Sequence, residues 1–143
     1  MKTPLSFPLR LFLVIGAACL LSVGLWIVYT VDPQQEAFLP CLVHALTGGY
    51  CPGCGASRAL HSLLHGHLYQ AVRYNAVFVL LLPCIITYGA AFVRDFLPGK
   101  PIRIHQWLPA PLLYGLLAVL LLFGVLRNLP VEPFVWLRPT PLG

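Results

Sequence analysis

The residues that could carry chemistry are concentrated in residues 34–72. This segment holds three of the five cysteines and four of the five histidines. At its centre, residues 51–55 read Cys-Pro-Gly-Cys-Gly. Two cysteines separated by two residues can bind one metal ion or close one disulfide bond. Pro52 favours a turn between them, and Gly53 and Gly55 allow backbone conformations that other residues resist.

The first interpretation is a metal site, with zinc as the candidate ion. A structural zinc ion takes four ligands, of which Cys51 and Cys54 supply two. Cys41 is the candidate for the third ligand. Candidates for the fourth ligand are the histidines His44, His61 and His65. The chain has no second Cys-x-x-Cys pair, however, and the spacing from Cys54 to His61 is shorter than that of a zinc finger.

The second interpretation is a disulfide bond, either between Cys51 and Cys54 or between one of them and Cys41. A disulfide is expected if the segment faces an oxidising compartment. A redox-active pair is a narrower form of the same idea, although no βαβ pattern of a thioredoxin-like domain accompanies it. The third interpretation is purely structural, because cysteine packs as a small buried residue and Pro-Gly shapes a tight turn.

An amphipathic helix is predicted to begin just after Gly55. Apolar residues recur along one side of it, while Arg58 and the histidines His61 and His65 fall on the other side. Gly66 can divide this helix into two pieces. Cys54 would then lie at a helix N-terminus, where the helix dipole favours a thiolate, and Arg58 would add positive charge one turn later. The same geometry could bind an anion such as a lipid phosphate.

The composition indicates that residues 34–72 are held between membrane-spanning helices. Of the 143 residues, 59% are hydrophobic and only 9% are charged, against roughly 25% charged residues in a soluble domain. A soluble enzyme and a disordered chain are therefore excluded, and one integral membrane unit over residues 1–143 is expected. We predict an all-α protein with three transmembrane helices, an interfacial or re-entrant helix, and an extended Pro-rich tail. The predicted spans are residues 11–31, 74–93 and 107–126, and the tail is residues 129–143.

Two polar or helix-breaking residues stand out in the second predicted span. Asn75 is an amide near the start of the span, where such a group often hydrogen bonds to another helix. Pro83 lies in the middle of the span, where a kink is expected.

The charge pattern fits membrane anchoring better than binding to nucleic acid. The net charge is +5, but the basic residues stand singly near the ends of apolar runs. A nucleic-acid-binding protein would cluster them, so no nucleic-acid partner is expected. The distribution of Lys and Arg favours a cytoplasmic N-terminus, which would place residues 34–72 outside.

The sequence around the motif resembles a family of small bacterial membrane proteins that is defined only as a domain of unknown function. The resemblance rests on Leu-Thr-Gly at residues 46–48, on Cys-Pro-Gly-Cys-Gly-Ala-Ser-Arg-Ala at residues 51–59, on Gly66 and on Asn75. It departs from the family pattern in two places, because Pro40 precedes Cys41 and because Ala76 replaces a proline. The resemblance implies a bacterial inner-membrane protein with no known activity. The resemblance also singles out Cys41, Cys51, Cys54, Arg58 and Asn75 as residues of interest.

The leading functional prediction is a non-enzymatic membrane protein. Its cysteine motif would be a structural knot or a metal site, and it would act in the bilayer with a membrane-protein partner or a second copy of itself. The first alternative is a membrane oxidoreductase that depends on thiols or metal, with Cys51 and Cys54 as the reactive pair. The second alternative is a module that binds an anion or lipid headgroup through Arg58 and the helix N-terminus.

Overall fold

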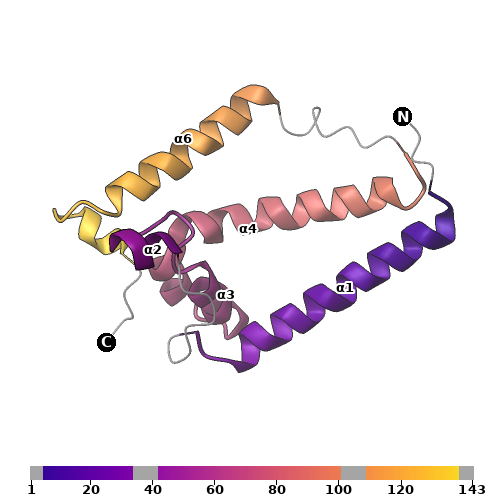
Figure 1. The fold of residues 1–143 in the computed structure, drawn as a ribbon, viewed down its shortest axis with the longest axis horizontal. Coiled ribbons are helices and arrows are strands. Elements are labelled where there is room, and N and C mark those ends of the chain that lie inside the picture. Colours follow the sequence, from indigo (N-terminus) through magenta and orange to yellow (C-terminus); the bar gives the residue numbers. More distant parts are fainter. Residues whose placement is uncertain (1–4, 34–41, 101–108, 139–143) are drawn as a thin grey trace.

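The computed structural model describes residues 5–33, 42–100 and 109–138, and the regular elements in these ranges are all helical (Figure 1). The predicted all-α class is therefore confirmed for the described part of the chain. The elements are α1 (Phe7–Thr30), α2 (Leu42–Thr47), α3 (Ala56–Leu64), α4 (Leu68–Phe96), α6 (Ala110–Leu126) and the 3-10 helix η1 (Phe134–Leu137). The described part of the predicted Pro-rich tail thus contains one short helix.

Two helices are long and apolar enough to cross a membrane, namely α1 with 24 residues and α4 with 29 residues. α1 covers most of the predicted first span, and α4 contains the whole of the predicted second span. The third apolar helix, α6, has 17 residues. At 1.5 Å per residue it is about 26 Å long, slightly less than the roughly 30 Å of a bilayer's hydrocarbon core.

The long helices expose their apolar side chains. Phe12 and Leu20 of α1, Leu80 of α4 and Leu121 of α6 each have more than 60% of their surface accessible. In water such surfaces would drive aggregation, whereas in a bilayer lipid tails cover them. The small buried core lies where α3 packs on α4, around Ala59, Ala71 and Tyr74.

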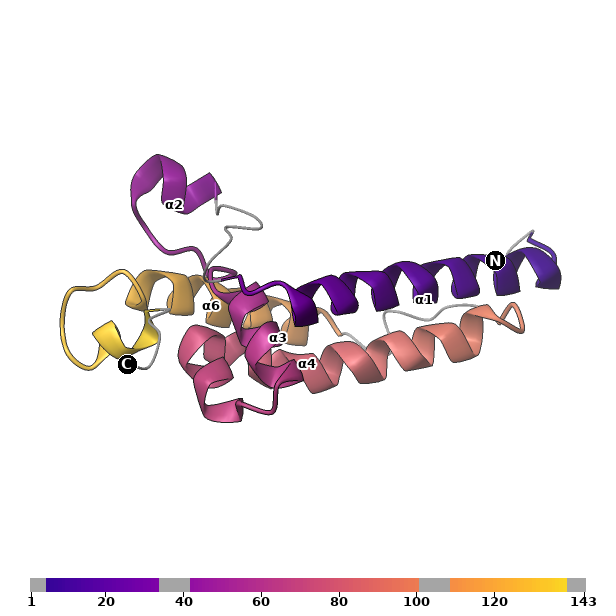
Figure 2. The same ribbon diagram turned by 90° about the horizontal axis from the view of Figure 1, so that it is seen from below.

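The helices meet at one end of the molecule. The C-terminal ends of α1 and α6, the N-terminal part of α4, and the elements α3 and η1 all gather there (Figure 1). At the opposite end, the start of α1 meets the end of α4, and Arg10 Nη1 donates to the Leu97 carbonyl over 3.5 Å. The view from below shows α1 and α4 extending in the same direction from α3, with α2 standing apart from them (Figure 2).

Glycine and asparagine interrupt the chain of helices at two points. Gly66, at φ +80°, separates α3 from α4, so the predicted division of the amphipathic helix is correct. Within α4, Asn75 has non-helical dihedrals (φ −161°, ψ 93°), and the helix is kinked there. The helix continues through Pro83 without a break, as expected, whereas the interruption at Asn75 was not predicted. The reason is the side-chain chemistry of Asn75, described below.

Candidate functional site

The candidate site is built on the turn formed by residues 51–55, called here the cysteine turn. The Cys54 N–H donates to the Cys51 carbonyl over 3.0 Å, and the Ala56 N–H donates to the Gly53 carbonyl over 3.1 Å. Gly55, at φ +82°, leads directly into α3, which begins at Ala56 as predicted. Cys54 therefore lies immediately before a helix N-terminus.

Replacing Gly55 with alanine is expected to strain the cysteine turn. A side chain at φ +82° clashes with its own backbone, so the variant should lose about 1–2 kcal/mol of unfolding free energy. Gly53→Ala is the matched control, because a Cβ there would meet only Cys51 Sγ at an ordinary 3.8 Å. Chemical unfolding of the two purified variants measures the difference. Equal losses in both variants would show that the turn does not need the conformation of Gly55.

The two sulfur atoms of the cysteine turn touch each other. Cys51 Sγ and Cys54 Sγ lie 3.2 Å apart, and the Cys51 N–H donates to Cys54 Sγ over 3.3 Å. A disulfide bond would bring the sulfurs to about 2.05 Å, and two zinc-bound thiolates would lie about 3.8 Å apart in a tetrahedral site. Cys54 is buried, whereas Cys51 is partly exposed.

Asn75 fixes the cysteine turn to α4. Its side-chain Nδ2 donates to the Pro52 carbonyl over 2.8 Å and to the Cys54 carbonyl over 3.3 Å. Its Oδ1 accepts from the Phe78 N–H over 3.0 Å, so Asn75 acts as an N-cap for the helix that follows the kink. The sequence predicted that Asn75 bonds to another helix. The structure corrects the partner, because the side chain binds the turn.

Arg127 closes the site from α6. The Phe78 N–H binds Asn75 Oδ1 and the kink breaks the helix, which leaves the Tyr74 carbonyl available to another donor. Arg127 Nη2 donates to this carbonyl over 2.7 Å, Nη1 donates to the Cys51 carbonyl over 3.3 Å, and Nε donates to the Leu137 carbonyl over 2.7 Å. One fully buried guanidinium therefore joins the cysteine turn, the kink of α4 and the chain after α6.

The charge of Arg127 is electrostatically coupled to the cysteines. Burial lowers the pKa of Arg127 below its usual value, while Coulombic attraction to Cys54, Cys51 and Tyr50 acts in the opposite direction. None of these neighbours is a carboxylate. Among the described residues, the groups that act to raise this pKa are therefore weak acids, with Cys54 as the largest contributor.

Asn128 adds a second connection from the end of α6. Its Oδ1 accepts from the Tyr50 N–H and its Nδ2 donates to the Tyr50 carbonyl, each over 2.8 Å. Close packing accompanies this pairing, because a Cβ on Gly124 would lie only 3.3 Å from Pro52 Cδ. Sequence reasoning missed Arg127 and Asn128 as site residues, because a basic residue after an apolar run is also what a membrane anchor looks like.

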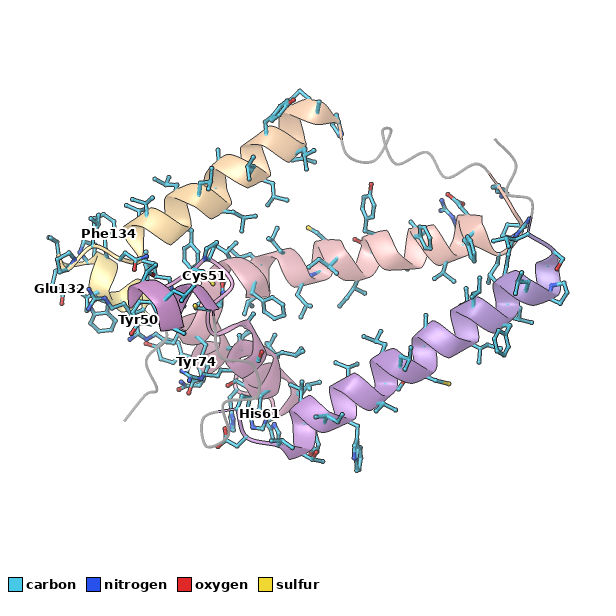
Figure 3. All side chains as sticks on the ribbon, in the orientation of Figure 1. Tyr50, Cys51, His61, Tyr74, Glu132 and Phe134 are labelled. Carbon is cyan, nitrogen blue, oxygen red and sulfur yellow. The ribbon has the colours of Figure 1, made fainter. Side chains whose placement is uncertain are left out.

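The histidine and arginine candidates on α3 lie elsewhere. His61 Nδ1 lies 2.6 Å from the Val28 carbonyl at the end of α1, and the His65 ring stacks on Tyr29 at 4.4 Å. Figure 3 shows His61 beside the end of α1, whereas Cys51 and Tyr50 lie near α6. Arg58 Nε points to the Pro33 carbonyl at 3.5 Å, so this side chain contacts the segment after α1.

The predicted zinc ligands are therefore brought together only in part. Cys51 and Cys54 are adjacent, but no group of three or more His, Cys, Asp or Glu side chains within residues 5–33, 42–100 and 109–138 could hold a metal ion. Cys41 and the side chain of His44 lie outside the described residues. A zinc site that uses them stays a prediction from the sequence.

The cysteine turn lies in the part of the chain that matches a known protein-family model. The family model described as "Protein of unknown function (DUF2752)" matches residues 41–89. The matched range contains the cysteine turn, α3 and Asn75, whereas Arg127 lies beyond it. No curated protein and no solved structure matches the chain. The resemblance seen in the sequence is thus confirmed as similarity to a family of unknown function, while the role of its cysteine signature stays a prediction.

Proposed function

We propose that this chain is a small multi-pass protein of a bacterial inner membrane, with α1, α4 and α6 as three spans. The cysteine turn is its structural knot at one membrane boundary, and the protein acts with a membrane partner or a second copy. The bacterial location follows from the resemblance of the motif. The exposed apolar surfaces of the helices and the alternating directions of α1, α4 and α6 (Figure 1) support the proposed three-span arrangement.

The observation that carries the structural role is the burial of Arg127. Burying an arginine is costly unless its donors are satisfied, and here they bind three backbone carbonyls in three separate segments of the chain. Two of these carbonyls belong to Cys51 and Tyr74, so the guanidinium holds the cysteine turn against the kink in α4. A knot of this kind fixes the positions of the helix ends that a partner would meet.

The partner is proposed on the same geometry. The three proposed spans pack little on one another, and α1 carries large exposed side chains such as Phe12, Leu20 and Trp26 along its length. Lipid covers much of this surface, and another membrane helix can pack on the rest. The structural role by itself requires no reaction at the cysteines.

The three-span topology predicts the side of the membrane on which each loop lies. His67→Cys and Val131→Cys should be labelled by a membrane-impermeant maleimide in intact cells, because both residues are exposed at the end that holds the cysteine turn. Lys100→Cys, at the opposite end, should be labelled only after the membranes are opened. Labelling is scored against the parent chain, which carries the native cysteines alone.

The labelling pattern separates the parts of the proposal. If Val131→Cys behaved like Lys100→Cys, α6 would not cross the membrane and the three-span topology would be wrong. If the pattern were inverted at all three positions, the spans would stand and the predicted orientation would be wrong. If all three cysteines were labelled in intact cells, the chain would not be an integral inner-membrane protein.

A further inference from the structure

The cysteine turn has a feature that a structural knot does not need, namely two thiol side chains held in contact. The Sγ atoms of Cys51 and Cys54 are 3.2 Å apart, so about 1 Å of movement would bring them to bonding distance. The backbone on both sides is fixed, because Arg127 binds the Cys51 carbonyl and Asn75 binds the carbonyls of Pro52 and Cys54. Such a fixed pair can close and open a disulfide with little rearrangement of the helices.

The two sulfurs differ in accessibility. Cys51 is partly exposed, whereas Cys54 retains only 9% of its surface. A reactant that approaches from water therefore meets Cys51 first. Cys54 lies behind it, where it accepts the Cys51 N–H and precedes the N-terminus of the nine-residue helix α3.

The surroundings also provide positive charge for a thiolate. Arg127 is fully buried, and its hydrogen-bond partners are neutral carbonyls. A thiolate at Cys54 would balance this charge and would be further stabilised by the amide that points to its sulfur. A thiolate is the reactive form of cysteine in exchange with disulfides.

We propose that Cys51 and Cys54 form a thiol–disulfide exchange site, with Cys51 as the entering sulfur, Cys54 as the resolving sulfur and a disulfide-bearing molecule as the substrate. This inference goes beyond the proposed structural role, which does not require the pair to react. The substrate class is defined by its chemistry, and its source is either a low-molecular-weight disulfide or a disulfide in a protein.

The proposed reaction proceeds in two balanced steps. Cys51 loses its proton and its thiolate attacks one sulfur of the substrate disulfide, which forms a mixed disulfide and releases the other substrate sulfur as a thiolate that takes up the proton. Cys54 then loses its proton and its thiolate attacks Cys51 Sγ, which breaks the mixed disulfide and releases the second substrate sulfur as a thiolate that takes up that proton. The cysteine pair has lost two electrons and the substrate has gained them. The reverse sequence oxidises a dithiol substrate.

Variants that lack one sulfur separate the two roles. The purified full-length protein in detergent is incubated with oxidised glutathione, and adducts are located by peptide mass spectrometry. Cys54→Ser should accumulate a mixed disulfide at Cys51, roughly tenfold more than Cys51→Ser accumulates at Cys54. The wild-type protein should instead form the Cys51–Cys54 disulfide, in a proportion that rises with the ratio of oxidised to reduced glutathione. Cys84→Ser is the matched control, because Cys84 is an exposed cysteine in α4 and should leave both results unchanged.

A second substrate distinguishes the possible sources of the disulfide. A peptide cyclised by one disulfide replaces glutathione in a parallel reaction. Faster exchange with the peptide than with glutathione identifies a protein disulfide as the natural substrate class, and the opposite order identifies a small molecule.

Three outcomes would overturn the proposal. The first is the absence of a Cys51–Cys54 disulfide at every glutathione ratio. The second is equal adduct formation in the two single variants, which would remove the assigned roles. The third is a bound zinc ion in the native protein that disappears in Cys51→Ser. Thermal unfolding of the same samples keeps the two proposals apart, because a stable but unreactive protein leaves the structural knot intact.

Discussion

Replacing Arg127 with alanine is expected to destabilise this protein more than any other single substitution at the cysteine turn. The change leaves the carbonyls of Cys51, Tyr74 and Leu137 without their donors and opens a cavity among them. Each unsatisfied buried group costs about 1–3 kcal/mol, so the variant should lose about 3–5 kcal/mol of unfolding free energy. Chemical unfolding in detergent and the amount of protein that accumulates in membranes both measure this loss.

Two further variants test the reason for this loss. Arg127→Lys keeps the charge but replaces the planar fork of donors with a single ammonium group, so part of the loss should remain. Arg94→Ala is the matched control, because Arg94 is exposed and forms an ion pair with its neighbour Asp95, away from the cysteine turn. It should behave like the wild type. If Arg127→Ala also unfolded like the wild type, the guanidinium would not be holding the site.

Replacing Asn75 with alanine is expected to have the second largest effect. The side chain caps the helix after the kink through Phe78, and it binds the carbonyls of Pro52 and Cys54. Losing the cap costs about 1 kcal/mol, and leaving buried carbonyls unsatisfied raises the total to about 2–4 kcal/mol. The same unfolding measurement applies, and circular dichroism shows whether the helix content near the kink falls as well.

Asn75→Asp separates the two functions of this side chain. An aspartate can still accept from the Phe78 N–H, but as a carboxylate it cannot donate to the cysteine turn and would repel the two carbonyls. The variant should therefore be destabilised even though the cap is kept. Asn128→Ala is the comparison at an exposed amide, where a loss of about 1 kcal/mol is expected. Full stability of Asn75→Asp would show that the contact with the turn contributes nothing.

The elements that the sequence predicted well are those that depend on local patterns. Uncharged apolar runs identified α1 and α4 as helices able to cross a membrane, because length and composition decide that property. Gly55 marked the start of α3 and Gly66 marked its separation from α4, because both sites need a positive φ that glycine adopts readily. These features are determined by residues close together in the chain.

The features that were missed depend on contacts between distant residues. Arg127 binds Cys51 and Asn128 binds Tyr50 across more than 70 residues, and no periodicity or spacing encodes such a pair. The kink at Asn75 is a further case, since an amide becomes a cap and a tether only when a turn with available carbonyls packs beside it. Pro83, by contrast, stays within a continuous helix.

The histidines show how a correct local observation can suggest the wrong neighbour. His61 and His65 do share a helix face, as their spacing predicts, and their rings lie 4.3 Å apart. That face packs against the end of α1, where the partners are the Val28 carbonyl and the Tyr29 ring. The direction in which a helix face points is set by how the helices pack, and the sequence contains that information only indirectly.

The most direct test of the account is a double-mutant cycle between Arg127→Lys and Asn75→Ala, measured by reversible unfolding in one detergent. Both side chains hold the same turn, from α6 and from α4, so their effects should depend on each other. We expect a coupling free energy of about 1–2 kcal/mol between the two positions. Strictly additive losses would contradict the central claim, because they would show that Arg127 and Asn75 do not act together on the cysteine turn.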